Sequence, residues 1–149
     1  TAQAGLRIEL IEDESGENFF PRGSAQLKNA AAVGLAIVAH ELLQLHNPIV
    51  VEGHTDASVY GGSSSYTNWE LSTDRANAAR RMLQTAGLQR GRITEVRGYA
   101  DTKLSRPDEP FAAQNRRISV LLPYTEPPPP EEGPAGIATR VNARLGVTP

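Results

Sequence analysis

The spacing of apolar and polar residues in the first half of the chain predicts a strand, a helix and a second strand. Residues 6–10 alternate apolar and charged side chains, as in a strand with one buried face. Apolar residues then recur about every 3.6 positions over residues 25–45, which predicts an amphipathic helix with Ser24 as its N-cap. Residues 47–48 (Asn-Pro) are expected to end it. Residues 49–52 begin with three apolar side chains, which predicts a central strand buried on both faces.

The second half of the chain predicts one more helix and two more strands. A loop over residues 57–67 carries a Gly-Ser run, and Asn68 is expected to N-cap a helix that ends near Ala86. Residues 92–96 and 115–122 have the composition and alternation of strands. The predicted order is β-α-β-α-β-β. Two helices that each connect two strands favour an α+β fold, with a mixed sheet and both helices on one face.

The chain divides into one domain and two flanking segments. Its 149 residues suffice for a single hydrophobic core. We assign residues 1–4 to the remnant of a linker, residues 5–124 to the domain, and residues 125–149 to a spacer, stiffened by four prolines, and a tail. The longest apolar run, residues 30–39, is shorter than the roughly 20 residues of a membrane helix. We therefore expect neither a membrane span nor a signal peptide among these residues.

Charge and cysteine content exclude several classes of function. The formal net charge is −2, which provides no general electrostatic attraction to nucleic acid or to an anionic membrane. The chain has no cysteine, so disulfides and thiolate-bound zinc are excluded. Lys28 and Lys103 are the only lysines, and every other basic residue apart from histidine is arginine. Arginine suits planar, bidentate recognition of carboxylates.

Two similar segments contain the second and third predicted strands. "IVVEGHTD" and "ITEVRGYAD" both end in Gly, a ring-bearing residue, a small residue and Asp. We expect Gly53 to let the strand turn tightly, and Asp56 and Asp101 to lie at one edge of the sheet. Clefts at the ends of parallel strands often bind ligands. Asp is also a frequent turn residue, so the repeat by itself leaves a binding site and simple turn chemistry equally open.

The sequence does not predict a metal site or a nucleophilic centre. His40 and His46 are six residues apart, whereas two metal ligands on one helix face are typically four apart, so we expect both at the surface. His54 has no second histidine nearby and is expected to be a structural hydrogen-bonding residue that orients the turn. Ser58 and residues 63–65 lie outside any G-x-S-x-G elbow. We expect no cofactor.

A carboxylate and a guanidinium form the remaining candidate site. Asp56 follows the second strand, and Arg75 lies near the start of the second helix. If that helix begins above the end of the strand, Asp56 faces Arg75 and the free N–H groups after Asn68. This arrangement suits a zwitterion whose ammonium binds Asp56 and whose carboxylate binds Arg75 and the helix N-terminus. The alternative is an internal Asp56–Arg75 salt bridge of little energetic value.

Four motifs resemble those of a known family. They are "GHTD" (residues 53–56), "NWELSTDRANAARRML" (68–83), "GYAD" (98–101) and "NRRISV" (115–120). In this order and spacing they resemble the OmpA-like peptidoglycan-binding domain, over roughly residues 6–122. The resemblance implies a β-α-β-α-β-β fold and binding of peptidoglycan through the diaminopimelate of its stem peptide. Family members hold that group with the motif residues that correspond here to Asp56 and Arg75, and the same match implies supporting contacts from Thr55, Asn68 and Arg116.

The segments "FFPRGSAQL" and "NWELS" are most similar to the MotB group, the stator proteins of the bacterial flagellar motor. This resemblance implies a non-enzymatic periplasmic domain of a protein anchored in the inner membrane. It also implies a homodimer that joins a MotA-like partner through a transmembrane part outside these residues. Arg117 is expected to face away from Arg116 along the strand and to act structurally.

Two other functions remain open. The domain can belong to another envelope protein, such as a porin or a lipoprotein with a peptidoglycan-binding tail. It can also be a cell-wall hydrolase that uses Asp56 and Asp101, since glycoside hydrolysis needs two carboxyl groups about 5–10 Å apart. A guanidinium beside Asp56 favours the ionised carboxylate, which is the wrong form for a general acid.

Overall fold

The computed structural model describes residues 5–13, 19–59 and 65–124, and it confirms the predicted order of elements. The predicted spacer and tail, and residues 60–64 of the Gly-Ser loop, lie outside the described residues. The elements are β1 (Gly5–Ile11), α1 (Asn29–Leu42), β2 (Ile49–His54), α2 (Asn68–Thr85), β3 (Ile93–Gly98), the 3-10 helix η1 (Ala113–Asn115) and β4 (Arg117–Pro123).

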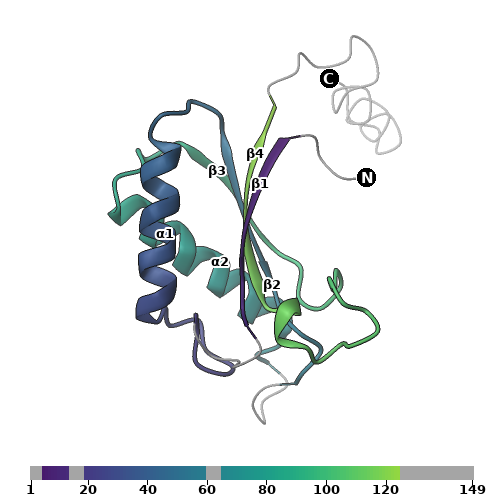
Figure 1. Cartoon of the computed structure of the whole chain (residues 1–149). Helices are drawn as coiled ribbons and strands as arrows, with labels where there is room; N and C mark the ends of the chain where they lie inside the picture. Colours follow the sequence, from purple (N-terminus) through teal and green to yellow (C-terminus); the bar gives the residue numbers. More distant parts are fainter. Residues whose placement is uncertain (1–4, 14–18, 60–64, 125–149) are drawn as a thin grey trace, which may run out of the picture.

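The four strands form one mixed sheet in the order β1-β4-β2-β3. β2 and β3 are parallel, whereas β4 runs antiparallel to both β1 and β2. Both helices cover the same face of this sheet, as predicted (Figure 1). Every residue of β2 is buried, because the strand has a neighbour on each side, so the prediction of a central strand is confirmed.

The core lies between the two helices and the covered face of the sheet. Leu35 and Leu42 of α1 and Leu83 of α2 pack against Val51 of β2 and Val120 of β4. On each helix these positions follow the 3.6-residue period, so one stripe of the surface is buried. Neither described helix combines the length and the apolar character that a membrane span requires.

Both helices begin at other residues than predicted. α1 starts at Asn29 rather than near residue 25, and the Ser24 hydroxyl accepts a hydrogen bond from the main chain two residues later instead of capping a helix. The N-cap of α2 is Thr67, whose hydroxyl accepts from the Trp69 N–H at 3.2 Å. Asn68 is therefore the first helical residue, and its side chain is available for other contacts.

Gly53 and Gly98 allow α2 to pack unusually close to the sheet. The two glycines are paired in the parallel register of β2 and β3. A Cβ on Gly53 would overlap the Ser72 carbonyl, and one on Gly98 would overlap the Thr73 side chain. The prediction that Gly53 lets the strand turn tightly is therefore wrong: Gly53 lies within β2, and its lack of a side chain makes room for the helix.

We predict that Gly53→Ala destabilises the domain by about 3 kcal/mol, because the added methyl meets backbone atoms that cannot rotate away. The measurement is the free energy of unfolding in urea. Gly34→Ala is the control: it lies in α1, where a Cβ meets the flexible end of Leu10, and it should change stability by less than about 1 kcal/mol. Equal stability of Gly53→Ala and wild type would contradict the close-packing argument.

Candidate ligand-binding site at the end of β2

Asp56 lies two residues beyond β2 and is almost wholly buried, with 1 % of its surface exposed. Nη1 of Arg116 donates to its Oδ2 at 2.6 Å, and the Ser58 N–H donates to its Oδ1 at 2.8 Å. A buried carboxylate requires such partners, because desolvating an unpaired ion is costly. These contacts hold the Asp56 side chain in one orientation.

Arg75 extends from the second turn of α2 and is also buried. Its Nε donates to the Ser24 carbonyl at 2.8 Å, and its Nη2 donates to the Pro21 carbonyl at 3.3 Å. The guanidinium also lies over the Phe20 ring, 4.8 Å from the centroid, in a cation–π contact. The segment before α1 therefore fixes the direction in which Arg75 points.

Asp56 makes a short ion pair that the sequence did not predict. We expected Asp56 to face Arg75, but the guanidinium at 2.6 Å belongs to Arg116, 60 residues along the chain. The physical reason is the strand order. Since β4 lies beside β2 in antiparallel orientation, the residue that precedes β4 reaches the end of β2.

Thr55 and Asn68 brace the backbone around Asp56. The Thr55 hydroxyl donates to the Asp56 carbonyl at 2.9 Å, and the Asn68 amide donates to the carbonyls of Asp56 (3.4 Å) and Ser58 (2.8 Å). The Thr55 N–H donates to the carbonyl of Ala100, which follows β3. Ala100 has a φ of 52°, which is uncommon for a residue with a side chain. The ends of β2 and β3 and the start of α2 are thereby joined.

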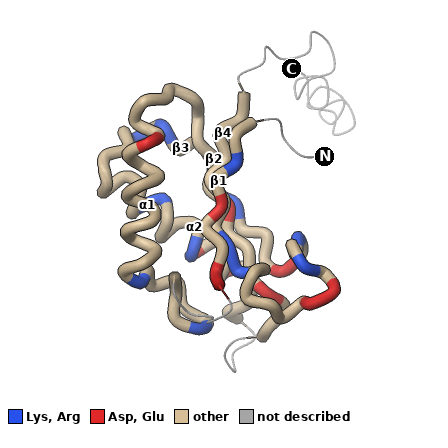
Figure 2. Tube along the Cα trace, in the orientation of Figure 1, with Lys and Arg blue, Asp and Glu red and all other residues tan. Residues whose placement is uncertain are grey.

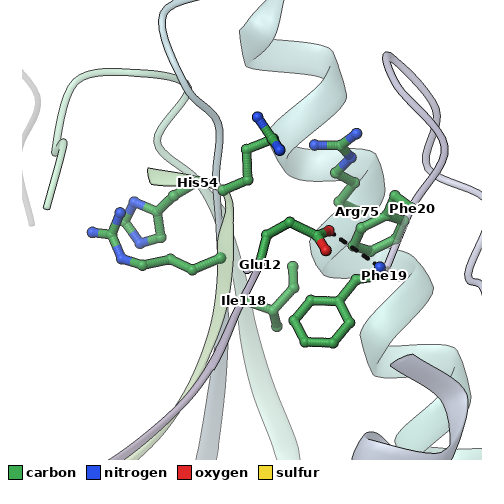
Figure 3. A pocket seen from close by; sticks show the side chains of 8 residues that line it. Glu12, Phe19, Phe20, His54, Arg75 and Ile118 are labelled. Carbon is green, nitrogen blue, oxygen red and sulfur yellow. Dashed lines mark hydrogen bonds between the residues drawn. The ribbon is translucent and has the colours of Figure 1, made fainter. Parts of the chain in front are cut away.

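Arg75 and Arg116 both line a narrow pocket. Figure 3 shows Arg75 in it next to Phe20. The free space of the pocket is about 10 Å³, room for roughly one water molecule. Glu12, which the sequence analysis did not select, is buried here and accepts a hydrogen bond from the Phe19 N–H at 3.1 Å. The sequence feature that could have marked Glu12 as a site residue is its position directly after β1. The lining residues are Glu12, Phe19, Phe20, His54, Arg75, Arg116, Arg117 and Ile118.

Other residues selected from the sequence have different surroundings. His40 and His46 are exposed, as predicted. Asp101 is exposed as well, so it does not share the buried setting of Asp56. Arg117 donates to two main-chain carbonyls and lies 3.8 Å from a Glu9 carboxylate oxygen. Across residues 5–13, 19–59 and 65–124, no three acidic or histidine side chains converge as a metal site.

Comparison with known proteins identifies the family. The model of the OmpA family matches residues 19–117, well over half of the chain. The chain belongs to the OmpA family. The matched region contains all five residues predicted for the site, namely Thr55, Asp56, Asn68, Arg75 and Arg116.

Curated relatives of this OmpA-family chain include motility proteins. Motility protein B of Escherichia coli (strain K12) is 42 % identical over 121 residues, which are 80 % of this chain and 39 % of that protein. The putative flagellar export/assembly protein LafU of Escherichia coli O44:H18 is 41 % identical over 118 residues, 79 % of this chain and 38 % of that protein. The chain thus spans about two fifths of the length of these relatives.

Solved structures confirm the α+β fold. The periplasmic domain of Helicobacter pylori MotB matches with a TM-score of 0.70 and 17 % identity, covering 97 % of this chain and 92 % of that one. The cell wall anchor of the T6SS from Pseudomonas aeruginosa gives 0.64 and 23 %, covering 80 % and 81 %. The peptidoglycan-associated lipoprotein of Burkholderia pseudomallei gives 0.54 and 29 %, covering 69 % and 86 %.

His54 of this OmpA-family domain packs rather than hydrogen-bonds. Its ring stacks on Tyr99, with centroids 5.1 Å apart and an interplanar angle of 12°. Within the part of the chain that the structure describes, neither ring nitrogen has a hydrogen-bond partner. Burial lowers the pKa of His54 below its usual value of about 6.5, so the ring is neutral at pH 7. The predicted hydrogen-bonding role is therefore wrong.

Glu52 joins three strands of the OmpA-family sheet through a second charge cluster. Arg7 of β1 donates to its Oε1 at 2.7 Å, and Arg97 of β3 donates to its Oε2 at 3.1 Å. His54 Nε2 lies 3.9 Å from Oε1. Burial alone raises the pKa of Glu52, but the hydrogen-bonded ion pairs with Arg7 and Arg97 outweigh burial and lower it to about 2. Charged residues of both signs accordingly lie along these strands (Figure 2).

We predict a pH dependence of stability that requires Glu52. The folded pKa is depressed from 4.5 to about 2, so the ionised carboxylate stabilises the fold above pH 4.5 and this contribution is lost as the pH falls towards 2. Between pH 5 and pH 2, the free energy of unfolding of wild type, measured in urea, should fall by up to about 3 kcal/mol more than that of Glu52→Gln. Glu95→Gln, at an exposed carboxylate, is the control and should follow wild type. Parallel pH curves for wild type and Glu52→Gln would refute this assignment.

Proposed function

We propose that this domain binds peptidoglycan without catalysis and thereby anchors a flagellar motor stator unit to the cell wall. The observation that carries the proposal is the ion pair between buried Asp56 and partly buried Arg116, which lines one pocket together with Arg75, in an OmpA-family chain that is 42 % identical to a motility protein B. The ligand group is the zwitterionic centre of diaminopimelate in the stem peptide. A fixed carboxylate and two fixed guanidinium groups complement one ammonium and one carboxylate.

Binding proceeds by an exchange of ion-pair partners. The ligand ammonium takes the place of the Arg116 guanidinium on Asp56, and the ligand carboxylate binds the guanidinium groups of Arg116 and Arg75. Every buried charge then remains paired, which avoids the cost of leaving one ion alone. The pocket has room for about one water, so its side chains must move as the ligand enters. Thr55 and Asn68 support this step by holding the backbone of Asp56.

The whole protein, in this proposal, lies in the bacterial inner membrane with this domain in the periplasm. It forms a homodimer and joins a MotA-like partner through its transmembrane part. The similarity to motility protein B and to the fold of a MotB periplasmic domain supports this arrangement. One zwitterion offers few contacts, so each site binds weakly, and two sites in a dimer gain strength from their high effective concentration.

A second candidate is a peptidoglycan-binding domain of another envelope protein. The 29 % identity to a peptidoglycan-associated lipoprotein and the likeness to a T6SS cell wall anchor favour it. The gene sequence upstream of Thr1 separates the two: an apolar helix with an acidic residue indicates a stator, and a lipidation site indicates a lipoprotein.

We predict that Asp56→Ala and Arg75→Ala each lower co-sedimentation with purified peptidoglycan at least tenfold, because Asp56 is the partner of the ligand ammonium and Arg75 is one of the two partners of its carboxylate. Asp101→Asn is the matched control, since it changes an exposed acid in the corresponding GYAD segment, and it should bind as wild type does.

Removing Asp56 leaves Arg116 without a short ion pair that the fold provides, so folding must be checked by circular dichroism. Asp56→Asn, which keeps the side-chain shape, provides a second variant. Folded variants that sediment as wild type would refute the site. Release of soluble muropeptides from sacculi by wild type would refute a non-catalytic role.

A further inference from the structure

Exposed aromatic side chains lie near the Asp56 turn but play no part in the charged site. Tyr66 and Trp69, at the start of α2, are 37 % and 55 % exposed. A soluble protein gains nothing in stability from an indole in water, and exposed aromatic groups often mark binding surfaces. Trp69 directly follows Asn68, whose amide is bonded to the carbonyls of Asp56 and Ser58.

Trp69 and Tyr66 line an open hollow at the first turns of α2. Its volume is about 430 Å³, and the other lining residues are Glu70, Thr73 and Asp74. The hollow therefore combines two aromatic rings with two carboxylates and a hydroxyl. Such a combination suits a ligand that has an apolar face and several hydrogen-bond donors at its edge.

Hydrogen bonds hold this surface in one arrangement. The Tyr66 hydroxyl donates to Asp74 Oδ2 at 2.8 Å, and the Thr73 hydroxyl donates to the Trp69 carbonyl at 2.8 Å. The Thr67 hydroxyl, at the N-cap, donates to Glu70 Oε2 at 2.7 Å. Burial and the bond to Asp74 raise the pKa of Tyr66 to about 12. A surface ordered before binding loses little entropy when the ligand arrives.

We infer that Trp69 and Tyr66 form a glycan subsite that stacks on a hexosamine ring of the peptidoglycan strand, while Glu70 and Asp74 accept hydrogen bonds from its hydroxyl and amide groups. The C–H face of a pyranose is apolar and matches an aromatic ring, and its equatorial hydroxyls require acceptors. The inference rests on the proposed function, because it assumes that the ligand is the same polymer, whose stem peptide binds at Asp56.

The two subsites can be occupied by one polymer. Asn68 ties the start of α2 to the Asp56 turn, so the hollow and the charged site keep a fixed separation. Asn68, which contacts the Asp56 turn, and Trp69, which lines the hollow, are adjacent in the first turn of α2, and a helix is about 10–12 Å wide. An extended peptide spans roughly 3.3–3.6 Å per residue, so a few residues of stem peptide bridge that distance.

Three probes test the inference: intact sacculi, peptide-free glycan strands and a free diaminopimelate-containing stem peptide. We expect Trp69→Ala to lower affinity for sacculi about tenfold and to remove binding of glycan strands, while stem-peptide affinity stays unchanged. Trp69→Phe, which keeps a smaller ring, should recover most of the loss. Tyr124→Ala is the matched control, since Tyr124 is 64 % exposed but lies just beyond β4, and it should bind all three probes as wild type does.

Wild-type binding of glycan strands by folded Trp69→Ala would overturn the inference. So would an equal loss of stem-peptide affinity, which would place Trp69 in the charged site, or an equal effect of Tyr124→Ala, which would indicate non-specific adhesion. Asp56→Ala separates this inference from the proposed function. It should abolish stem-peptide binding and leave glycan-strand binding intact. The two probes therefore test the charged site and the glycan subsite separately.

Discussion

The close packing of α2 on Gly53 and Gly98 is the constraint on which the rest of the site depends. The parallel register of β2 and β3 places the two glycines side by side, and Ser72 lies above them. The Ser72 hydroxyl accepts a hydrogen bond from the Ala100 N–H at 3.0 Å and donates to the Trp69 carbonyl at 3.1 Å. The first turns of α2 are thereby fixed to the ends of both strands, which positions the groups that surround Asp56.

Two buried acids near the end of β2 have different surroundings. Glu52 lies within the strand, and arginines from the strands on both outer edges of the sheet hold its two oxygens. Breaking that cluster would separate elements of the fold. Asp56 lies beyond the strand, where the Arg116 guanidinium and the Ser58 N–H are among the groups that hold it. In the proposed exchange a ligand ammonium replaces that guanidinium at Asp56, which lies outside β2, whereas the Glu52 cluster lies within the sheet.

The segment before α1 shows where the periodicity of the sequence misleads. A helix capped by Ser24 would use the Ser24 carbonyl to accept from the Lys28 N–H. In the structure that carbonyl accepts from Arg75 at 2.8 Å, and the Lys28 N–H donates to the Phe19 carbonyl at 2.8 Å instead. A tertiary contact from the second helix therefore takes the place of the first turn of the first helix. The local sequence pattern does not show that Arg75 competes with the Lys28 N–H for the Ser24 carbonyl.

The sequence by itself determined the order of elements, the central position of β2 and the residue types at the site. Apolar periodicity reports which face of an element is buried, and the motifs around Asp56 and Arg75 carry the family resemblance. The tertiary structure decided which charges meet. The sheet places β4 beside β2, so Arg116 and not Arg75 provides the short ion pair of Asp56. It also decided that Gly53 serves helix packing, because strand order and the distance between layers depend on contacts between residues far apart in the chain.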